Sequence, residues 1–566
     1  MEFIAIKFWE FINRSKGWIT LSFVIIGTFI LRLPTIFIDY IHIDVITSYI
    51  LAKRDLAGLS FTPNKGWVYH YLVKWSIILF GNSPSSFHFT GIIFVILTVL
   101  FIYLLGRKIY NKRNGTIAAL LYGFIISSYN TEFLATNAEI IYNLFFVSTF
   151  YFFYLCIFEK RYICIFPFII SVILGIFTKF QGSFAFLAIL AYLLLIKPAF
   201  AITIKTKKIK YYIIIISTMM ILFLAIYYDF SYSKIFFQSS LNNSITRMIN
   251  YVSNRGFSPL LIIGKLLWRS FHFTLYHSII WIPALYYIYK FFTQKYKKNE
   301  KDAYIISIIV FLFLTIFIGG ARLSVHYFIP VLPLLSILSA NEILRRIDNV
   351  KAKKLFFKLI MLPVLFFFIW NVKDVYIAHF KPEWKHEESK IAFLFRIIAI
   401  GSHGEYLLPH KSLLPVLQYI GENTTEDDKL LVWPMGTEVI YFSGRRSVEP
   451  NYWYNEAALH AIVQKEKNDL STFNRYEKTI IKKIKKLSPD YFVDVGSTSM
   501  IRKVLIYKKN NDPPYYFDIN TAPMIRFGSF GGLNNFPKII DFLNNNYDFA
   551  GNFGEAQVWK KRDRNK

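Results

Sequence analysis

The acidic residue Asp44 stands just after the first long apolar run of the chain. His42 precedes it by two residues, and Tyr49 follows it by five. A carboxylate in such a setting can act as a general base, taking a proton from a hydroxyl group that attacks an electrophile. Asp is also common at the start of a helix, where it accepts backbone hydrogen bonds. The sequence alone leaves both interpretations of Asp44 open.

Three basic residues adjoin apolar runs that lie far apart in the sequence: Lys179, Arg322 and His326. N–H donors and positive charge gathered at one place would bind a phosphate. Each residue also has a simpler explanation: a lysine reaching toward lipid headgroups, an interfacial arginine, and a hydrogen-bonded buried histidine. We predict that the three converge near the outer face of a membrane, although each simpler explanation stays open.

Glu139, Lys65 and His70 are further candidates. Glu139 opens an apolar run, whereas Lys65 and His70 lie in a long stretch between two such runs. Glu139 would place an acceptor or orient Asp44, and the other two would contact phosphate or sugar. A hydrogen-bonded helix start and a solvated loop explain them equally well. The sequence holds no zinc-type Cys/His spacing and no phosphate-binding P-loop.

Membrane spans are the elements that must position these residues. The chain of 566 residues is 54% hydrophobic, with a mean hydropathy of +0.38. Because a bilayer core is about 30 Å thick, a span needs roughly 20 apolar helical residues. Eleven spans are predicted, at 18–38, 86–106, 115–131, 139–158, 162–178, 180–197, 211–229, 271–290, 303–319, 327–344 and 355–372.

The distribution of charge sets the predicted orientation. Residues 1–373 hold 38 Lys and Arg against 13 Asp and Glu, whereas residues 374–566 hold 27 against 23. The basic residues gather in every second loop, which places those loops and the N-terminus in the cytoplasm. An odd number of spans then puts 374–566 outside. Charge placed in this way argues against nucleic-acid binding.

Two domains follow from this pattern. Residues 1–373 form a transmembrane domain with a long first outer loop, 39–85, and residues 374–566 form a soluble α/β domain. Its predicted elements are strands at 429–433, 491–495, 503–507 and 557–559 and helices at 413–422 and 477–487, which favour a small mixed or parallel sheet. The two cysteines, Cys156 and Cys164, are expected to be unpaired thiols on the reducing side.

The order of these residues resembles the membrane glycosyltransferases with the glycosyltransferase-C fold. The branch containing protein O-mannosyltransferases and lipid A aminoarabinose transferases, which is glycosyltransferase family 39-like, is the most similar. The matching residues are Asp44, Tyr49, Ala52, Gly58, Lys65-Gly66, Tyr69, Tyr71, Phe80-Gly81, Glu139, Thr178-Lys179, Arg322, His326-Tyr327, Pro330 and Pro333. The resemblance spans nearly the whole chain and rests on the order of the motifs.

The resemblance implies a multi-pass enzyme of the plasma (inner) membrane. It would move a sugar from a polyprenyl-phosphate carrier to a glycan, lipid or protein acceptor at the outer face, with inversion and with Asp44 as the base. The implied substrate-binding residues are His42, Tyr49, Lys65, His70, Glu139, Lys179, Arg322, His326 and Tyr327. A divalent cation is the one cofactor in question, and Val45 stands where the family has a second acidic residue.

Two other classes of protein compete with this interpretation. A polytopic transporter or lipid flippase with an outer recognition domain would also need many spans. Such proteins tend to have internal repeats and interrupted spans at mid-membrane, neither of which is evident here. A membrane-tethered binding protein would rely on residues 374–566, where no titratable groups gather at catalytic spacing.

Overall fold

Contacts divide the chain into two compact units. The membrane unit comprises Met1–Ile41 and Lys65–Gly404, and the sheet unit comprises His42–Asn64 and Glu405–Lys566. The computed structural model describes residue 15 and residues 17–37, 43–58, 65–127, 131–193, 277–293, 299–318, 325–347, 414–433, 437–447, 470–495, 536–554 and 556–562. The predicted domain boundary at 373/374 lies outside these residues and stays a prediction.

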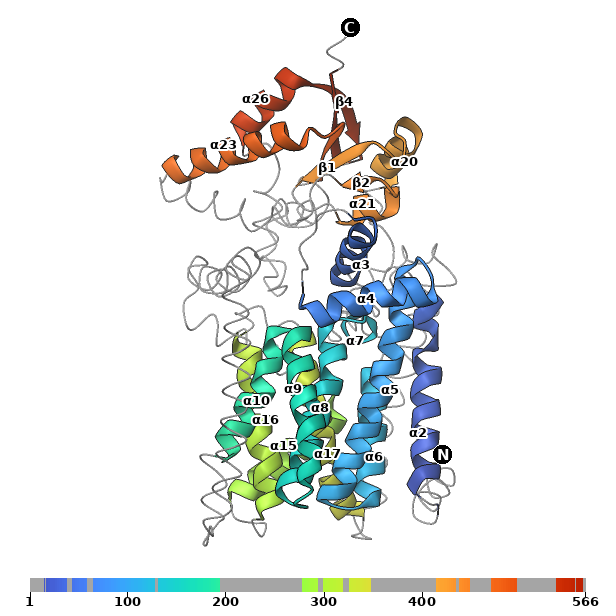
Figure 1. Ribbon diagram of the computed structural model, residues 1–566, viewed down its shortest axis with the longest axis vertical. Helices are drawn as coiled ribbons and strands as arrows, with labels where there is room; N and C mark the ends of the chain where they lie inside the picture. Colours follow the sequence, from blue (N-terminus) through green and yellow to red (C-terminus); the bar gives the residue numbers. More distant parts are fainter. Residues whose placement is uncertain are drawn as a thin grey trace, which may run out of the picture. The chain divides into compact units, whose positions relative to one another are not determined.

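The membrane unit is helical in its described part, and its long helices run side by side in Figure 1. The elements are α2 (Gly17–Arg32), η1 (Leu33–Phe37), α4 (Trp67–Phe80), α5 (Pro84–Ile109), α6 (Lys112–Ile126), α7 (Thr131–Leu134), α8 (Ala138–Ile157), η2 (Tyr162–Cys164), α9 (Ile165–Thr178), η3 (Phe180–Gly182), α10 (Ser183–Ala191), α15 (Ser278–Phe292), α16 (Glu300–Ile318), η6 (Val325–Val331) and α17 (Leu332–Ile347). Helices coincide with the predicted spans except 211–229 and 355–372, which lie outside the described residues.

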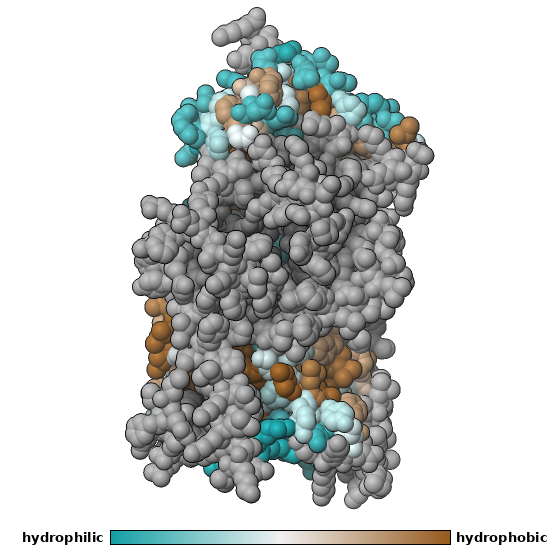
Figure 2. Space-filling view, turned by 180° about the vertical axis from the view of Figure 1, so that it is seen from behind, coloured by the Kyte–Doolittle hydropathy of each residue, from teal (hydrophilic) through white to brown (hydrophobic). Residues whose placement is uncertain are grey.

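Within the described part of the chain, three stretches of helix are long and apolar enough to cross a membrane: Pro84–Ile109, Ala138–Ile157 and Tyr327–Arg346. Large apolar side chains also lie on the outside of shorter helices. Phe23 on α2 and Phe166 on α9 are each 63% exposed. Figure 2 shows hydrophobic surface over the helical part of the molecule. Such a surface is costly in water and favourable against lipid tails, so it agrees with a multi-pass membrane protein.

The predicted outer loop 39–85 is largely helical. It contains α3 (Ile43–Leu56), which belongs to the sheet unit, and α4, which belongs to the membrane unit. One face of α4 is buried, including Tyr69, His70 and Val73, while Trp75 on the same helix is 55% exposed. The segment predicted as the first outer loop thus contains two helices, and α4 has the helical spacing of a half-buried surface helix. Its position outside the membrane stays a prediction.

The described residues of the sheet unit form a five-stranded sheet in the order β2-β1-β3-β5-β4. Strands β1 and β3 are parallel, and β5 runs antiparallel to β3 and β4. The elements are α20 (Leu414–Asn423), β1 (Lys429–Trp433), α21 (Thr437–Ser443), β2 (Arg446–Ser447), α23 (Leu470–Leu487), β3 (Tyr491–Asp494), α26 (Pro537–Asn546), β4 (Tyr547–Phe553) and β5 (Ala556–Lys561). The predicted mixed sheet is confirmed, whereas the predicted strand 503–507 lies outside the described residues.

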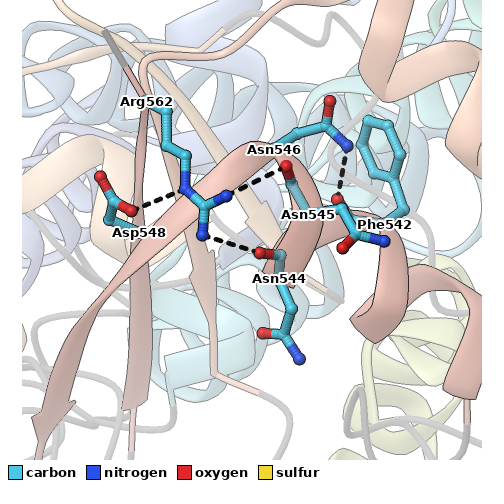
Figure 3. A network of polar contacts seen from close by, with 6 residues as sticks. All are labelled: Phe542, Asn544, Asn545, Asn546, Asp548 and Arg562. Atoms are coloured by element: carbon cyan, nitrogen blue, oxygen red, sulfur yellow. Dashed lines mark hydrogen bonds and ion pairs between the residues drawn. The ribbon is translucent and has the colours of Figure 1, made fainter. Parts of the chain in front are cut away.

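Polar contacts fix the ends of α26 in this unit. The carboxylate of Glu477, buried on α23, accepts the Lys538 backbone N–H at 3.0 Å, which satisfies a donor at the start of α26. At the other end the guanidinium of Arg562 donates to the carbonyls of Asn544 and Asn545 and to the carboxylate of Asp548 (Figure 3). A cation at a helix C-terminus also opposes the negative end of the helix dipole.

Candidate active site

A buried ion pair joins two helices of the membrane unit. The ammonium group of Lys179, the residue directly after α9, contacts the carboxylate of Glu139 in the first turn of α8. The Lys179 side chain is 13% exposed and that of Glu139 is 2% exposed. The alternative that Lys179 extends toward the lipid headgroups is therefore wrong. Charges this far from water are stable only when they are paired.

Tyr327 completes this cluster from a third element. The Lys179 ammonium lies 5.3 Å from the centroid of the Tyr327 ring, within the range of a cation–π contact. Asn143 of α8 keeps η6 in place, because its amide donates to the Ile329 carbonyl at 3.1 Å. The structure thus brings together three predicted site residues, Glu139, Lys179 and Tyr327, from segments up to 188 positions apart.

The arrangement suits the binding of an anion. An ammonium group has three N–H donors, so it can bond a carboxylate and a phosphate oxygen at the same time. Glu139 balances the lysine in the buried site. A buried cation is also worth more electrostatically than an exposed one, since little water screens it.

His70 and Lys65 lie at the start of α4 in the same unit. His70 is 2% exposed, and its ring makes edge contacts with Trp67 and Tyr71 at centroid distances of 6.0 and 5.9 Å. The solvated-loop interpretation is therefore wrong for His70. Lys65 is half-buried and precedes the helix by two residues.

Asp44 and Tyr49 lie on α3 in the sheet unit. Asp44 is half-buried in the first turn, where the positive end of the helix dipole stabilises a carboxylate. Tyr49 is 4% exposed, and its ring meets that of Tyr441 edge-on at 6.3 Å. Leu51 of the same helix belongs to the core beside β1 and β3. This packing holds α3 in a fixed position within the sheet unit.

The other predicted site residues are less fully described. His42 and Arg322 lie outside the described residues. His326 is described only by its place in η6, directly before Tyr327. The convergence of Lys179, Arg322 and His326 therefore stays a prediction.

Arg32 is a buried polar residue that the sequence reasoning missed. It is fully buried at the end of α2 and donates to the carbonyls of Ile126, Phe133 and Leu134 at 2.6, 3.0 and 3.0 Å. These carbonyls end α6 and α7, so the guanidinium satisfies acceptors that the two helices leave without an internal partner. The charge of Arg32 directly after an apolar run is the one sequence signal that could have indicated it.

Metal ligands do not gather within the described residues: no three His, Cys, Asp or Glu side chains there are placed to hold an ion. Val45, at the position of the family's second acidic residue, is fully buried in α3. Both cysteines are free thiols, as predicted.

The fold defines a class of protein. The chain has the fold of ArnT from Cupriavidus metallidurans, at 11% identity in both of its states. For ArnT bound to undecaprenyl phosphate the TM-score is 0.55, with 97% of this chain and 99% of that chain covered. For the apo state the TM-score is 0.52, with 96% and 97% covered. The fold therefore places the chain in the class of helical polytopic membrane proteins with a glycosyltransferase-C fold.

A family profile agrees with the fold. The family described as dolichyl-phosphate-mannose-protein mannosyltransferase matches residues 64–228, a range that contains α4, Glu139 and Lys179. No curated protein sequence matches the chain. The resemblance predicted from the sequence is thereby confirmed: over 165 of its 566 residues the chain is similar to this family of membrane glycosyltransferases.

Proposed function

We propose that this protein transfers a sugar from a polyprenyl-phosphate carrier to an acceptor at the outer face of the membrane. The observation that carries the proposal is the buried Lys179–Glu139–Tyr327 cluster, which lies partly within the family-matched segment and provides a cation for an anionic group. ArnT, which has this fold, has been seen with undecaprenyl phosphate bound. A lipid phosphate is the ligand that such a cluster would suit.

One base is enough for this reaction. The leaving group is a lipid phosphate whose second pKa is about 6, so it departs as an anion and needs no general acid. Asp44 takes the proton of the acceptor group, whose freed electron pair attacks the anomeric carbon opposite the phosphate. The bond from that carbon to the phosphate oxygen breaks, and the configuration inverts. Glycosidases, by contrast, need two carboxylates.

In this proposal, positively charged side chains stabilise the phosphate group as it leaves the sugar. Negative charge grows on the phosphate oxygens as the sugar–oxygen bond breaks, so N–H donors gain strength in the transition state. Lys179 fills this role in the proposal, together with Arg322 and His326. His42, Tyr49, Lys65, His70 and Tyr327 would line the substrates, while Glu139 holds Lys179. The acceptor remains defined only as a glycan, lipid or protein.

A direct assay tests the proposed function. The purified full-length chain is incubated with a synthetic isoprenoid-phosphate-linked sugar and a membrane extract that supplies acceptors. We expect free isoprenoid phosphate to appear by chromatography together with a labelled product. A donor that stays intact with every sugar and extract tried would contradict the proposal.

Replacement of Arg322 probes the phosphate site. Arg322→Ala is expected to weaken binding of isoprenoid phosphate by about tenfold or more, because a charge-assisted donor pair is lost. Arg322→Lys should restore only part, since an ammonium lacks the forked geometry of a guanidinium. Binding is measured by isothermal titration of the detergent-solubilised protein. Arg107→Ala, on the predicted cytoplasmic side, serves as control, and equal affinity in all variants would exclude Arg322 from the site.

The predicted orientation places the sheet unit outside the cytoplasm. Cys156 and Cys164 are replaced by Ser, and Thr479, exposed on α23, is replaced by Cys. A membrane-impermeant maleimide should label Thr479→Cys in intact cells whose outer layers admit the reagent. Labelling that appears only after the membranes are broken would place the unit in the cytoplasm.

A further inference from the structure

The first turn of α4 is bonded to both backbone segments that carry the ion pair. The N–H of Gly66, the N-cap of α4, donates to the Thr178 carbonyl at 3.1 Å, one residue before Lys179. The hydroxyl of Tyr69 donates to the Thr136 carbonyl at 2.7 Å, three residues before Glu139. In Figure 1 the helix lies across one end of the bundle. One short helix thus bridges the two sides of the Glu139–Lys179 contact.

Close packing fixes α4 on the Lys179 side. A Cβ atom on Gly66 would lie 2.1 Å from the Phe177 carbonyl oxygen, so the helix can approach this closely only with glycine at that position. Tyr69 is fully buried, and its ring packs edge-on against Phe87 of α5 at 5.2 Å. The Tyr69 ring is therefore held in a fixed position, and from there its hydroxyl reaches the Thr136 carbonyl.

Thr136 is held on its other side by α5. Its hydroxyl lies 3.1 Å from Nδ1 of His88, and a Cβ atom on Gly91 would meet that hydroxyl at 2.2 Å. Thr136 is itself fully buried. Contacts from α5 thus fix the side chain of Thr136. The hydrogen bond from the Tyr69 hydroxyl to the Thr136 carbonyl then fixes the position of this backbone segment relative to α4.

We propose that Tyr69 is a positioning residue for sugar transfer, which acts by fixing Glu139 relative to Lys179. The inference rests on the proposed function, since Lys179 is the group that meets the departing phosphate. A displacement of about 1 Å at a reacting group can cost on the order of 10²-fold in rate. Because the phosphate gains charge in the transition state, misplacing Lys179 lowers kcat more than it raises the donor KM.

Tyr304 provides a matched control. It is fully buried on α16, and its hydroxyl donates to the Phe150 carbonyl at 2.7 Å, so it makes the same kind of bond at the same distance. Tyr69→Phe and Tyr304→Phe each remove one such bond, and both should lower the melting temperature by a similar amount. Only Tyr69→Phe should lower kcat, by about 10- to 100-fold, with the donor KM changed less than about threefold.

The possible results distinguish a failure of the role proposed for Tyr69 from a failure of the proposed function. Equal turnover in the two variants, or a Tyr69→Phe defect confined to KM, would overturn the role of Tyr69 and leave the proposed function standing. A wild-type chain that never cleaves the donor would overturn both. As a second variant, Gly66→Ala should reduce kcat, whereas Gly27→Ala, which meets no atom within 4 Å, should not. Full activity of Gly66→Ala would contradict α4 as the bridge.

Discussion

Asp44→Asn is expected to remove nearly all sugar transfer while the protein stays folded. The amide keeps the size of the side chain but cannot accept the acceptor proton, and general-base contributions are about 10²- to 10⁴-fold. Asp44 is half-buried in the first turn of α3, so the change removes a charge rather than a packing group. The measurement is initial transfer rate with isoprenoid-phosphate-linked sugar.

Asp55→Asn is the matched control for this substitution. Asp55 is the other carboxylate of α3 and is also half-buried, but it lies in the last turn. It should retain transfer within about threefold of the original chain. Both variants should stay folded, with a stability loss of about 1 kcal/mol or less where the Asp44 charge no longer meets the helix dipole. An Asp44→Asn enzyme with full activity would remove Asp44 from the base role.

Lys179→Met is expected to be both destabilised and inactive. It leaves the carboxylate of Glu139, 2% exposed, without its cation, and breaking one partner of a buried pair costs about 3–5 kcal/mol. The combined variant Glu139→Gln/Lys179→Met should regain most of that stability, because neither charge remains. Transfer should stay at least about 10²-fold down, since no cation meets the phosphate.

The Glu159–Arg161 pair offers the comparison for stability. It lies between α8 and η2 with an N–O distance of 2.9 Å, and its arginine and glutamate side chains are 59% and 24% exposed. Because solvent screens the pair and Lys108 still contacts Glu159, Arg161→Met should cost less than about 1 kcal/mol. Thermal unfolding in detergent ranks the original chain and the three variants. Recovered transfer in the combined variant would show that the ion pair is structural and that Lys179 does not contact the phosphate.

Composition predicted much of the membrane unit, because a span needs only a long apolar run. It did not predict α4, which is 14 residues long and mixes Lys74 and Ser76 with apolar side chains. The buried positions of α4, such as Tyr69, Val73 and Ile77, have helical spacing, so the periodicity was available in the sequence. Strand β4 was missed as well, since Asn and Gly in Tyr547–Phe553 indicate a turn and most of its residues are not fully buried.

The candidate site was only partly predictable. Glu139 and Lys179 were each predicted as site residues from the sequence, because a charge beside an apolar run is costly and therefore indicates a specific role. Their pairing depends on how α8 packs against α9 and could not be read from residues 40 positions apart. Arg32 was missed for a similar reason. Its partners are backbone carbonyls, which carry no sequence signal.

The most direct test of the central claim follows the donor itself. The full-length protein is reconstituted in liposomes with an isoprenoid-phosphate-linked sugar of known anomeric configuration, labelled in the sugar and in the lipid, and with an acceptor extract. Mass spectrometry and NMR then follow both labels. The account predicts one free isoprenoid phosphate for each sugar transferred, with inverted configuration at the anomeric carbon. A donor that crosses the bilayer intact would instead identify a flippase, and a product with retained configuration would contradict a single displacement by Asp44.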